Sequence, residues 1–171
     1  MRTQIIHRIT LLATLSLLLL GPLLAQTPKA SPPKTAEREI NGKTITINYS
    51  SPSKKGRQIW GELVKYDKVW RTGANEATTL EISDDILIGG KALKKGKYAL
   101  FTIPNKDKWT IIINSNANQW GAYSYDKERD VLRFDVKPSP ASFTEMFTIT
   151  ISETGTISLI WDELKVEFPI E

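Results

Sequence analysis

The 171-residue sequence predicts an all-β protein built as a single antiparallel β-sandwich, with a jelly-roll-like arrangement or barrel closure as the variant. Three observations predict this class. Apolar and polar residues alternate with a period of two along most of the chain, and tight-turn dipeptides such as Asn41-Gly42 and Gly89-Gly90 separate the alternating segments. No segment beyond residue 25 carries a sustained stripe of apolar residues with the 3.6-residue period of a helix.

The first 25 residues have the pattern of a secretory signal peptide. Arg2 and Arg8 supply a basic start, residues 9–20 are mostly apolar, and Gly21-Pro22 precedes a small residue, Ala25, at the expected cleavage point. An uncleaved membrane anchor is the alternative, but the apolar run is shorter than the roughly 20 residues that a spanning helix needs. We therefore expect cleavage after Ala25, export to the periplasm or beyond, and no membrane span in the mature protein.

Cleavage would remove the only histidine, His7, and the chain has no cysteine. A mature protein without histidine or cysteine cannot use a Ser-His-Asp or Cys-His mechanism, and it cannot form a zinc site from the usual nitrogen and sulfur ligands. We expect no cofactor and no metal. Removal of Arg2 and Arg8 leaves 21 basic against 19 acidic residues, a net charge of +2. Lysines alternate with acids, as at Lys106-Asp107-Lys108, so we expect no nucleic-acid partner.

The rest of the chain divides into a spacer and one domain. Residues 26–37 contain three prolines and no large apolar side chain, which predicts a flexible spacer before an all-β domain over residues 38–171. Segments 98–103 and 109–113 are apolar on both faces and should form central strands. The alternating segments place the following residues on one face of each strand: Ile45, Ile47 and Tyr49; Leu132, Phe134 and Val136; Phe147, Ile149 and Ile151; Ile157, Leu159 and Trp161; Val166, Phe168 and Ile170.

Two segments, residues 51–78 and 114–125, follow neither the strand nor the tight-turn pattern. Long loops on a compact β domain are where binding residues concentrate. We therefore expect any functional site in these two segments, and the sequence leaves open whether they share one pocket.

Five sequence stretches resemble a known protein family. In chain order they read SPSKKGRQIWGELV, KVWRTGANEAT, IGGKALKKGKYALFTIP, WTIIIN and NQWGAYSYD. They are similar in order and spacing to the domain-of-unknown-function 2911 family of exported bacterial proteins, over about residues 37–171. The resemblance implies an all-β fold and export, and it implies no particular activity, cofactor or substrate. Lys65 departs from the family pattern, which has proline there.

Several residues of the first irregular segment are candidates for a site. Extending the alternation of Leu80 and Ile82 backwards turns Glu76 inward, where its carboxylate would need a cationic partner. Arg71 and Arg57 are the available guanidinium groups, and Asn75 lies beside Glu76. Such a pair is either an internal clamp that fixes the loop or the polar floor of a pocket, and both interpretations stay open here.

Aromatic residues are the second group of candidates. Trp70, Trp120 and Tyr123 lie in or beside the irregular segments, where they either form a platform for sugar rings or a peptide or cap the ends of the sandwich. These observations favour a non-catalytic binding module of the cell envelope for a glycan or peptide.

Two other functions are compatible with the sequence. A hydrolase without histidine could use Glu76 and Asp67 as acid and base, if their carboxyl groups lie about 5 to 10 Å apart. A structural or assembly protein would need no small-molecule site at all. The sequence does not determine the oligomeric state.

Overall fold

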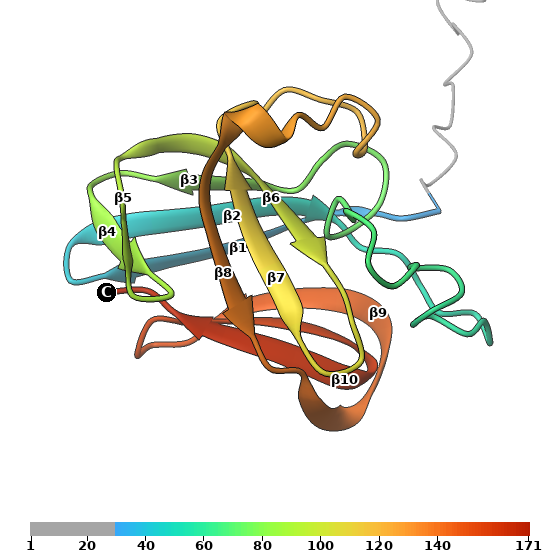
Figure 1. The fold of residues 1–171 in the computed structure, drawn as a ribbon. Coiled ribbons are helices and arrows are strands. Elements are labelled where there is room, and N and C mark those ends of the chain that lie inside the picture. The colour runs from blue at the N-terminus through green and yellow to red at the C-terminus, as the bar shows by residue number, and fades with distance from the viewer. Residues whose placement is uncertain (1–29) are drawn as a thin grey trace, which may run out of the picture.

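The computed structural model describes residues 30–171, which form two packed β layers with long loops at one end (Figure 1). The predicted signal peptide and the first part of the predicted spacer lie outside the described residues. Within residues 30–171 there is no α-helix, and no helix is long and apolar enough to cross a membrane. The elements are β1 (Pro33–Ile40), β2 (Lys43–Ser50), β3 (Thr79–Ile82), β4 (Ile86–Ile88), β5 (Lys91–Leu93), β6 (Gly96–Ile103), β7 (Trp109–Asn114), the 3₁₀ turn η1 (Lys127–Arg129), β8 (Asp130–Val136), β9 (Ser139–Ile151) and β10 (Thr156–Pro169).

The larger layer is a six-stranded antiparallel sheet in the order β1-β2-β3-β6-β7-β8. The second layer is the long β9–β10 hairpin, and a small β4–β5 hairpin closes one end (Figure 1). The backbone of Leu87 in β4 exchanges two hydrogen bonds with Glu171, which joins the small hairpin to the chain end. The all-β, antiparallel prediction is confirmed, and the described strands do not close into a barrel.

The core lies between the two layers and contains the residues that the alternation turned inward. Ile45, Ile47 and Tyr49 of β2 are buried against Phe147 and Ile149 of β9. The β10 residues Ile157, Leu159 and Trp161 are also buried, while the inward residues of the edge strand β8 are half-buried. The alternation therefore identified the core-facing side of these strands correctly.

β10 keeps its inner face by means of a bulge. The register against β9 shifts on both sides of Asp162, whose φ is +58°. Around this irregularity the buried positions of β10 change from odd to even numbers, from Trp161 to Val166, so both ends of the 14-residue strand face the same core.

The outer face of β6 and β7 has a smaller core of its own. Phe101 and Ile112 are fully buried there, and residues of the two irregular segments, including Val69, Ala122 and Tyr125, pack over them. β6 and β7 are also the two strands predicted to be central, and each is paired on both edges. The loops that were candidates for function thus also cover one face of the sheet.

The predicted spacer extends too far into the domain. Residues 33–37 belong to β1, where Pro33 faces Ser50 and Glu37 faces Thr46 in register with β2. β1 exposes most of its side chains, so it has almost none of the apolar alternation by which the other strands were predicted. Proline at its first position is compatible with an edge strand, because the ring costs no ladder hydrogen bond there.

Candidate binding pocket

The first irregular segment leaves β2 at Ser51 and is fixed at once to the second layer. The Ser51 hydroxyl donates to the carbonyl of Phe147 at 2.6 Å, and the Lys54 backbone N–H donates to the carbonyl of Glu145 at 2.8 Å. The Lys54 ammonium then reaches the bulge of β10, where Nζ lies 2.6 Å from Asp162 Oδ1. The start of the loop is therefore held against the β9–β10 hairpin.

The second half of the same segment is fixed to the sheet. Trp70 and Thr102 of β6 exchange two backbone hydrogen bonds, of 2.7 and 3.0 Å. The Thr78 hydroxyl donates to the carbonyl of Thr72 at 2.6 Å and closes the turn between them. Gly73 is required inside this turn, because its φ is +154° and a Cβ would lie 2.8 Å from the Ser50 carbonyl oxygen.

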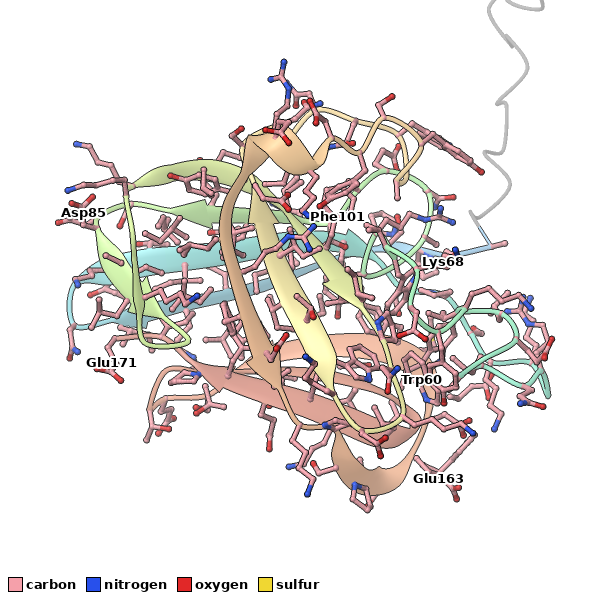
Figure 2. All side chains as sticks on the ribbon, in the orientation of Figure 1. Trp60, Lys68, Asp85, Phe101, Glu163 and Glu171 are labelled. Atoms are coloured by element: carbon pink, nitrogen blue, oxygen red, sulfur yellow. The ribbon has the colours of Figure 1, made fainter. Side chains whose placement is uncertain are left out.

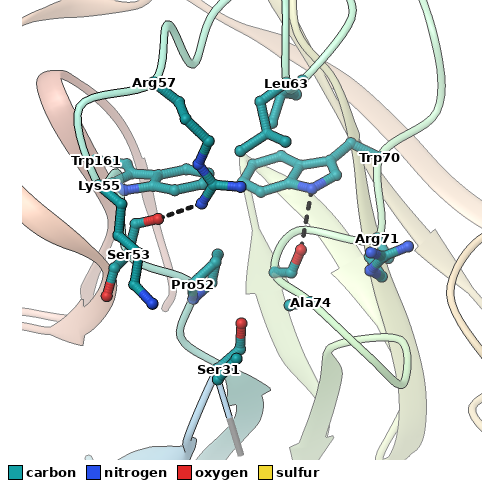
Figure 3. Close-up of a pocket in the computed structure, with 13 residues that line it drawn as sticks. Ser31, Pro52, Ser53, Lys55, Arg57, Leu63, Trp70, Arg71, Ala74 and Trp161 are labelled. Carbon is teal, nitrogen blue, oxygen red and sulfur yellow. Dashed lines mark hydrogen bonds between the residues drawn. The ribbon is translucent and has the colours of Figure 1, made fainter.

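A pocket of about 520 Å³ lies between the loop and the start of the described chain (Figure 3). Of the residues predicted as a site, Arg57, Trp70 and Arg71 line it. Figure 3 shows Arg57 and Leu63 on one side of the tryptophans, and Pro52, Ala74 and Ser31 on the other. The remaining lining residues are Ala30, Ser53, Lys55, Val64, Gly73 and Trp161.

The aromatic wall of the pocket is the edge of the main core. The rings of Trp70 and Trp161 are stacked, with centroids 6.1 Å apart and planes at 16°, and Trp60 packs edge-on against both. Figure 2 shows Trp60 at the loop end of the molecule, opposite the end that carries Asp85 and Glu171. The sequence assigned Trp161 to the core, and it is buried, yet it also contributes to the wall.

Both indole N–H groups of this wall have protein acceptors. Trp70 Nε1 donates to the carbonyl of Gly73 at 3.1 Å, and Trp161 Nε1 donates to the carbonyl of Glu145 at 3.1 Å. A molecule in the pocket therefore meets the carbon surface of the indoles rather than their polar edge.

The predicted inward position of Glu76 is wrong. Its side chain is exposed, and the backbone of Glu76 forms a single antiparallel bridge with Trp120. Regular β3 pairing begins only at Thr79, and the consecutive residues Ala77 and Thr78 are both buried, so the alternation ends before Glu76. The pocket that Arg57 and Arg71 line does not include Glu76, so the structure does not support the predicted buried clamp.

The other two polar candidates have local roles. Asn75 donates through Nδ2 to the Ser31 carbonyl and to Ser50 Oγ, at 3.3 and 3.2 Å, which ties the chain before β1 to the loop. Arg57 donates through Nε to the carbonyl of Lys54 at 2.9 Å and through a terminal nitrogen to the carbonyl of Ser53 at 2.5 Å. Arg57 is thereby held at the rim of the pocket.

The second irregular segment touches the first but does not line the same pocket. The Ala77 N–H donates to the carbonyl of Gln119 at 3.1 Å. Trp120 lines a separate shallow depression of about 380 Å³ together with Glu76, Lys97 and Asn118, and Tyr123 is 84 % exposed and lines none of the pockets described above. The sequence placed Trp120 and Tyr123 with Trp70 as one aromatic group, and the structure separates them.

A polar cluster under this second loop was not predicted. Tyr125 Oη donates to Asp130 Oδ2 at 2.6 Å, Arg133 Nε donates to the same oxygen at 2.5 Å, and Asn114 Nδ2 donates to Asp130 Oδ1 at 2.8 Å. Burial and the hydrogen bond to Asp130 raise the pKa of Tyr125 to about 12. The Asp130 side chain is only 7 % exposed, although the sequence around it, residues 126–130, is highly charged.

Neither catalytic nor metal chemistry is indicated by the acidic residues. Asp67, the proposed partner of Glu76, accepts from Asn105 Nδ2 at 2.7 Å and lines none of the pockets described here. Among residues 30–171 no three histidine, cysteine or carboxylate side chains converge as metal ligands.

Comparison with known proteins adds one finding. The model of a protein family described as "Protein of unknown function (DUF2911)" matches residues 31–170. No curated protein and no solved structure matches the chain.

Proposed function

Because the chain belongs to the DUF2911 family, whose description assigns no activity, we propose a function from the pocket itself: a non-catalytic binding module of the cell envelope that takes a glycan or a peptide. The observation that carries this proposal is the wall formed by Trp70 and Trp161 in a pocket of about 520 Å³. Pockets of about 300 to 1,000 Å³ with aromatic linings are typical of small-molecule and peptide sites.

Binding is favoured over catalysis by the residues that line the pocket. Among residues 30–171, the lining includes three cations and two serines but no carboxylate that could act as acid or base. The aromatic surface offers contact area, and the loop that supports it is fixed by Lys54 and Thr78. A fixed apolar surface lowers the entropic cost of binding.

A ligand screen tests the proposal. Purified exported protein would be titrated with a panel of oligosaccharides and short peptides, with thermal unfolding and tryptophan fluorescence as readouts. A ligand that binds only the native state must raise the melting temperature, and contact with Trp70 should change the emission. If no member of the panel shifts either signal, a structural or assembly role replaces the binding module.

Two exposed leucines give a matched pair of variants for any ligand found. Leu63 lines the pocket, while Leu87 lies in β4 at the far end, and the two are similarly exposed, at 45 and 40 %. Leu63→Ala should weaken binding about fivefold through lost apolar contact, and Leu87→Ala should leave it unchanged. Equal effects of both would place the ligand elsewhere.

Export is part of this proposal and has its own test. The protein recovered from the envelope fraction of its host should have the intact mass of a chain that lacks about residues 1–25. A stable full-length chain embedded in the membrane would contradict export by a cleaved signal peptide.

A further inference from the structure

The pocket wall carries three positively charged side chains. Arg57, Lys55 and Arg71 all line the pocket, and among residues 30–171 no carboxylate lines it. Two acids lie near its rim, but both have other partners. Asp162 pairs with Lys54 Nζ at 2.6 Å, and Glu145 Oε1 accepts the backbone N–H of Lys55 at 2.8 Å. The potential inside the pocket is therefore positive.

Arg57 is fixed in place without using all of its donors. Its two hydrogen bonds go to the carbonyls of Ser53 and Lys54, and a guanidinium has five N–H groups. In the view of Figure 3 the Arg57 guanidinium is drawn across the Trp70 and Trp161 rings, and the dashed bond runs from it to the Ser53 carbonyl on its left. A positioned guanidinium beside an apolar wall can take a carboxylate without the cost of ordering a free side chain.

Arg71 adds a further cation to the lining. Its Nε is buried and has no hydrogen-bond acceptor among residues 30–171, and its terminal nitrogen Nη1 lies beside the second loop, 3.1 Å from an ideal Cβ at Gly121. Removing a cation from water is unfavourable, so an anion in the pocket would lower its energy.

We propose that the pocket binds a peptide through a carboxylate, with an apolar side chain of the peptide against Trp70 and Leu63; this rests on the binding function proposed above. A peptide is favoured over an acidic sugar by the scarcity of neutral polar groups. Among residues 30–171, Ser31 and Ser53 are the only hydroxyl side chains in the lining and no side-chain amide lines it, and both indole N–H groups are already bonded. Sugar hydroxyls would find few partners there, whereas a carboxylate and an apolar side chain match the cations and the carbon surface.

Calorimetric titration with two matched probe pairs tests this inference. The first pair is an acetylated tripeptide ending in leucine as its free acid and as its amide. The second is trigalacturonate and a neutral galactose trisaccharide. We expect the free-acid peptide to bind about tenfold or more tightly than its amide, and its affinity to fall with rising salt.

Substitutions in the pocket test whether the preference for the free-acid peptide arises there. Arg57→Gln should weaken binding of the free-acid peptide about tenfold and leave binding of the amide peptide unchanged. Arg38→Gln, which makes the same charge change on the exposed surface of β1, should alter neither. Since Arg57 also bonds the loop backbone, Lys55→Gln is a second variant whose side chain has no such bond, and it should reduce the same preference.

The outcomes separate this inference from the binding function. Equal binding of acid and amide peptides would overturn the carboxylate inference and leave the binding module intact. Binding of trigalacturonate without the peptide acid would overturn the peptide as ligand. No binding of any probe here, together with a negative ligand screen, would overturn both proposals.

Discussion

Lys54 Nζ lies 2.6 Å from Asp162 Oδ1, and this ion pair joins the long loop after β2 to the bulge of β10. Both side chains are mostly buried, with exposed fractions of 24 and 16 %. The bulge that resets the inward face of β10 therefore also supplies the counter-charge that holds the loop. The pair has the role that the sequence assigned to Arg71 and Glu76.

Breaking this pair should destabilise the fold. Lys54→Met or Asp162→Asn alone leaves one poorly solvated charge without its partner, which should cost about 2 kcal/mol of unfolding free energy in urea titrations. The double variant should cost clearly less than the sum. Asparagine tolerates the positive φ of position 162, so the substitution tests charge rather than backbone strain.

The control is an exposed pair of the same kind. Lys65 Nζ lies 3.4 Å from Glu62 Oε2, and both side chains are more than 60 % exposed. Lys65→Met should therefore change the free energy of unfolding by less than about 0.5 kcal/mol. Strictly additive, small effects of Lys54→Met and Asp162→Asn would show that the loop is held by other contacts.

Two glycines with nearly the same backbone angle should respond very differently to alanine. Gly42 has φ +77° and open space around it, while Gly155 has φ +80° and a Cβ there would lie 2.5 Å from the Ile170 carbonyl oxygen. Gly42→Ala should cost about 1 kcal/mol from the left-handed backbone alone. Gly155→Ala should cost about 2 kcal/mol more, because the clash displaces the chain end from its hydrogen bond to Gly155. Equal melting temperatures of the two variants would contradict this geometry.

Tyr125 should make the protein sensitive to alkaline pH. Burial and the Asp130 hydrogen bond raise the pKa of Tyr125 to about 12 in the folded state, while an unfolded chain ionises tyrosine near pH 10. The unfolded state therefore binds fewer protons between these values. The contribution of Tyr125 to stability is complete below about pH 10 and should decline from there to about pH 12.

Urea titrations from pH 8 to 11.5 would measure this decline. Tyr125→Phe should be less stable than the wild type by about 1 kcal/mol at pH 8, and the difference should shrink as the pH rises. Tyr123 is 84 % exposed, so Tyr123→Phe is the control for a general effect of removing a tyrosine hydroxyl. A Tyr125→Phe difference that stays constant with pH would contradict a raised pKa.

The strands could be predicted where one face is buried and the backbone is regular. Ile45 to Tyr49 and Phe147 to Ile151 meet both conditions, so the period of two assigned their faces correctly. β1 was missed over residues 33–37 because an edge strand that exposes most side chains needs no apolar pattern. Asp162 was missed because a bulge depends on pairing with the partner strand.

The site was predicted in part, for the same reasons. Arg57, Trp70 and Arg71 share the pocket because the loop that carries them is long and lies at one end of the sandwich. Glu76 was placed wrongly because the alternation was extended backwards past Thr79, where the regular pairing of β3 begins. The separation of Trp120 from Trp70 depends on how the two loops pack over Phe101, which pattern alone does not encode.

The covering of β6 and β7 on both faces has a consequence for the motions of the protein. Both strands are hydrogen-bonded to a neighbouring strand on each edge. Water can reach either face only if a loop or the β9–β10 hairpin first separates from the sheet. In hydrogen–deuterium exchange, the backbone amides of Phe101 and Ile112 should therefore exchange last, at a rate set by unfolding of the whole domain. The edge strand β1 should exchange much earlier, through fraying that leaves the rest of the domain folded.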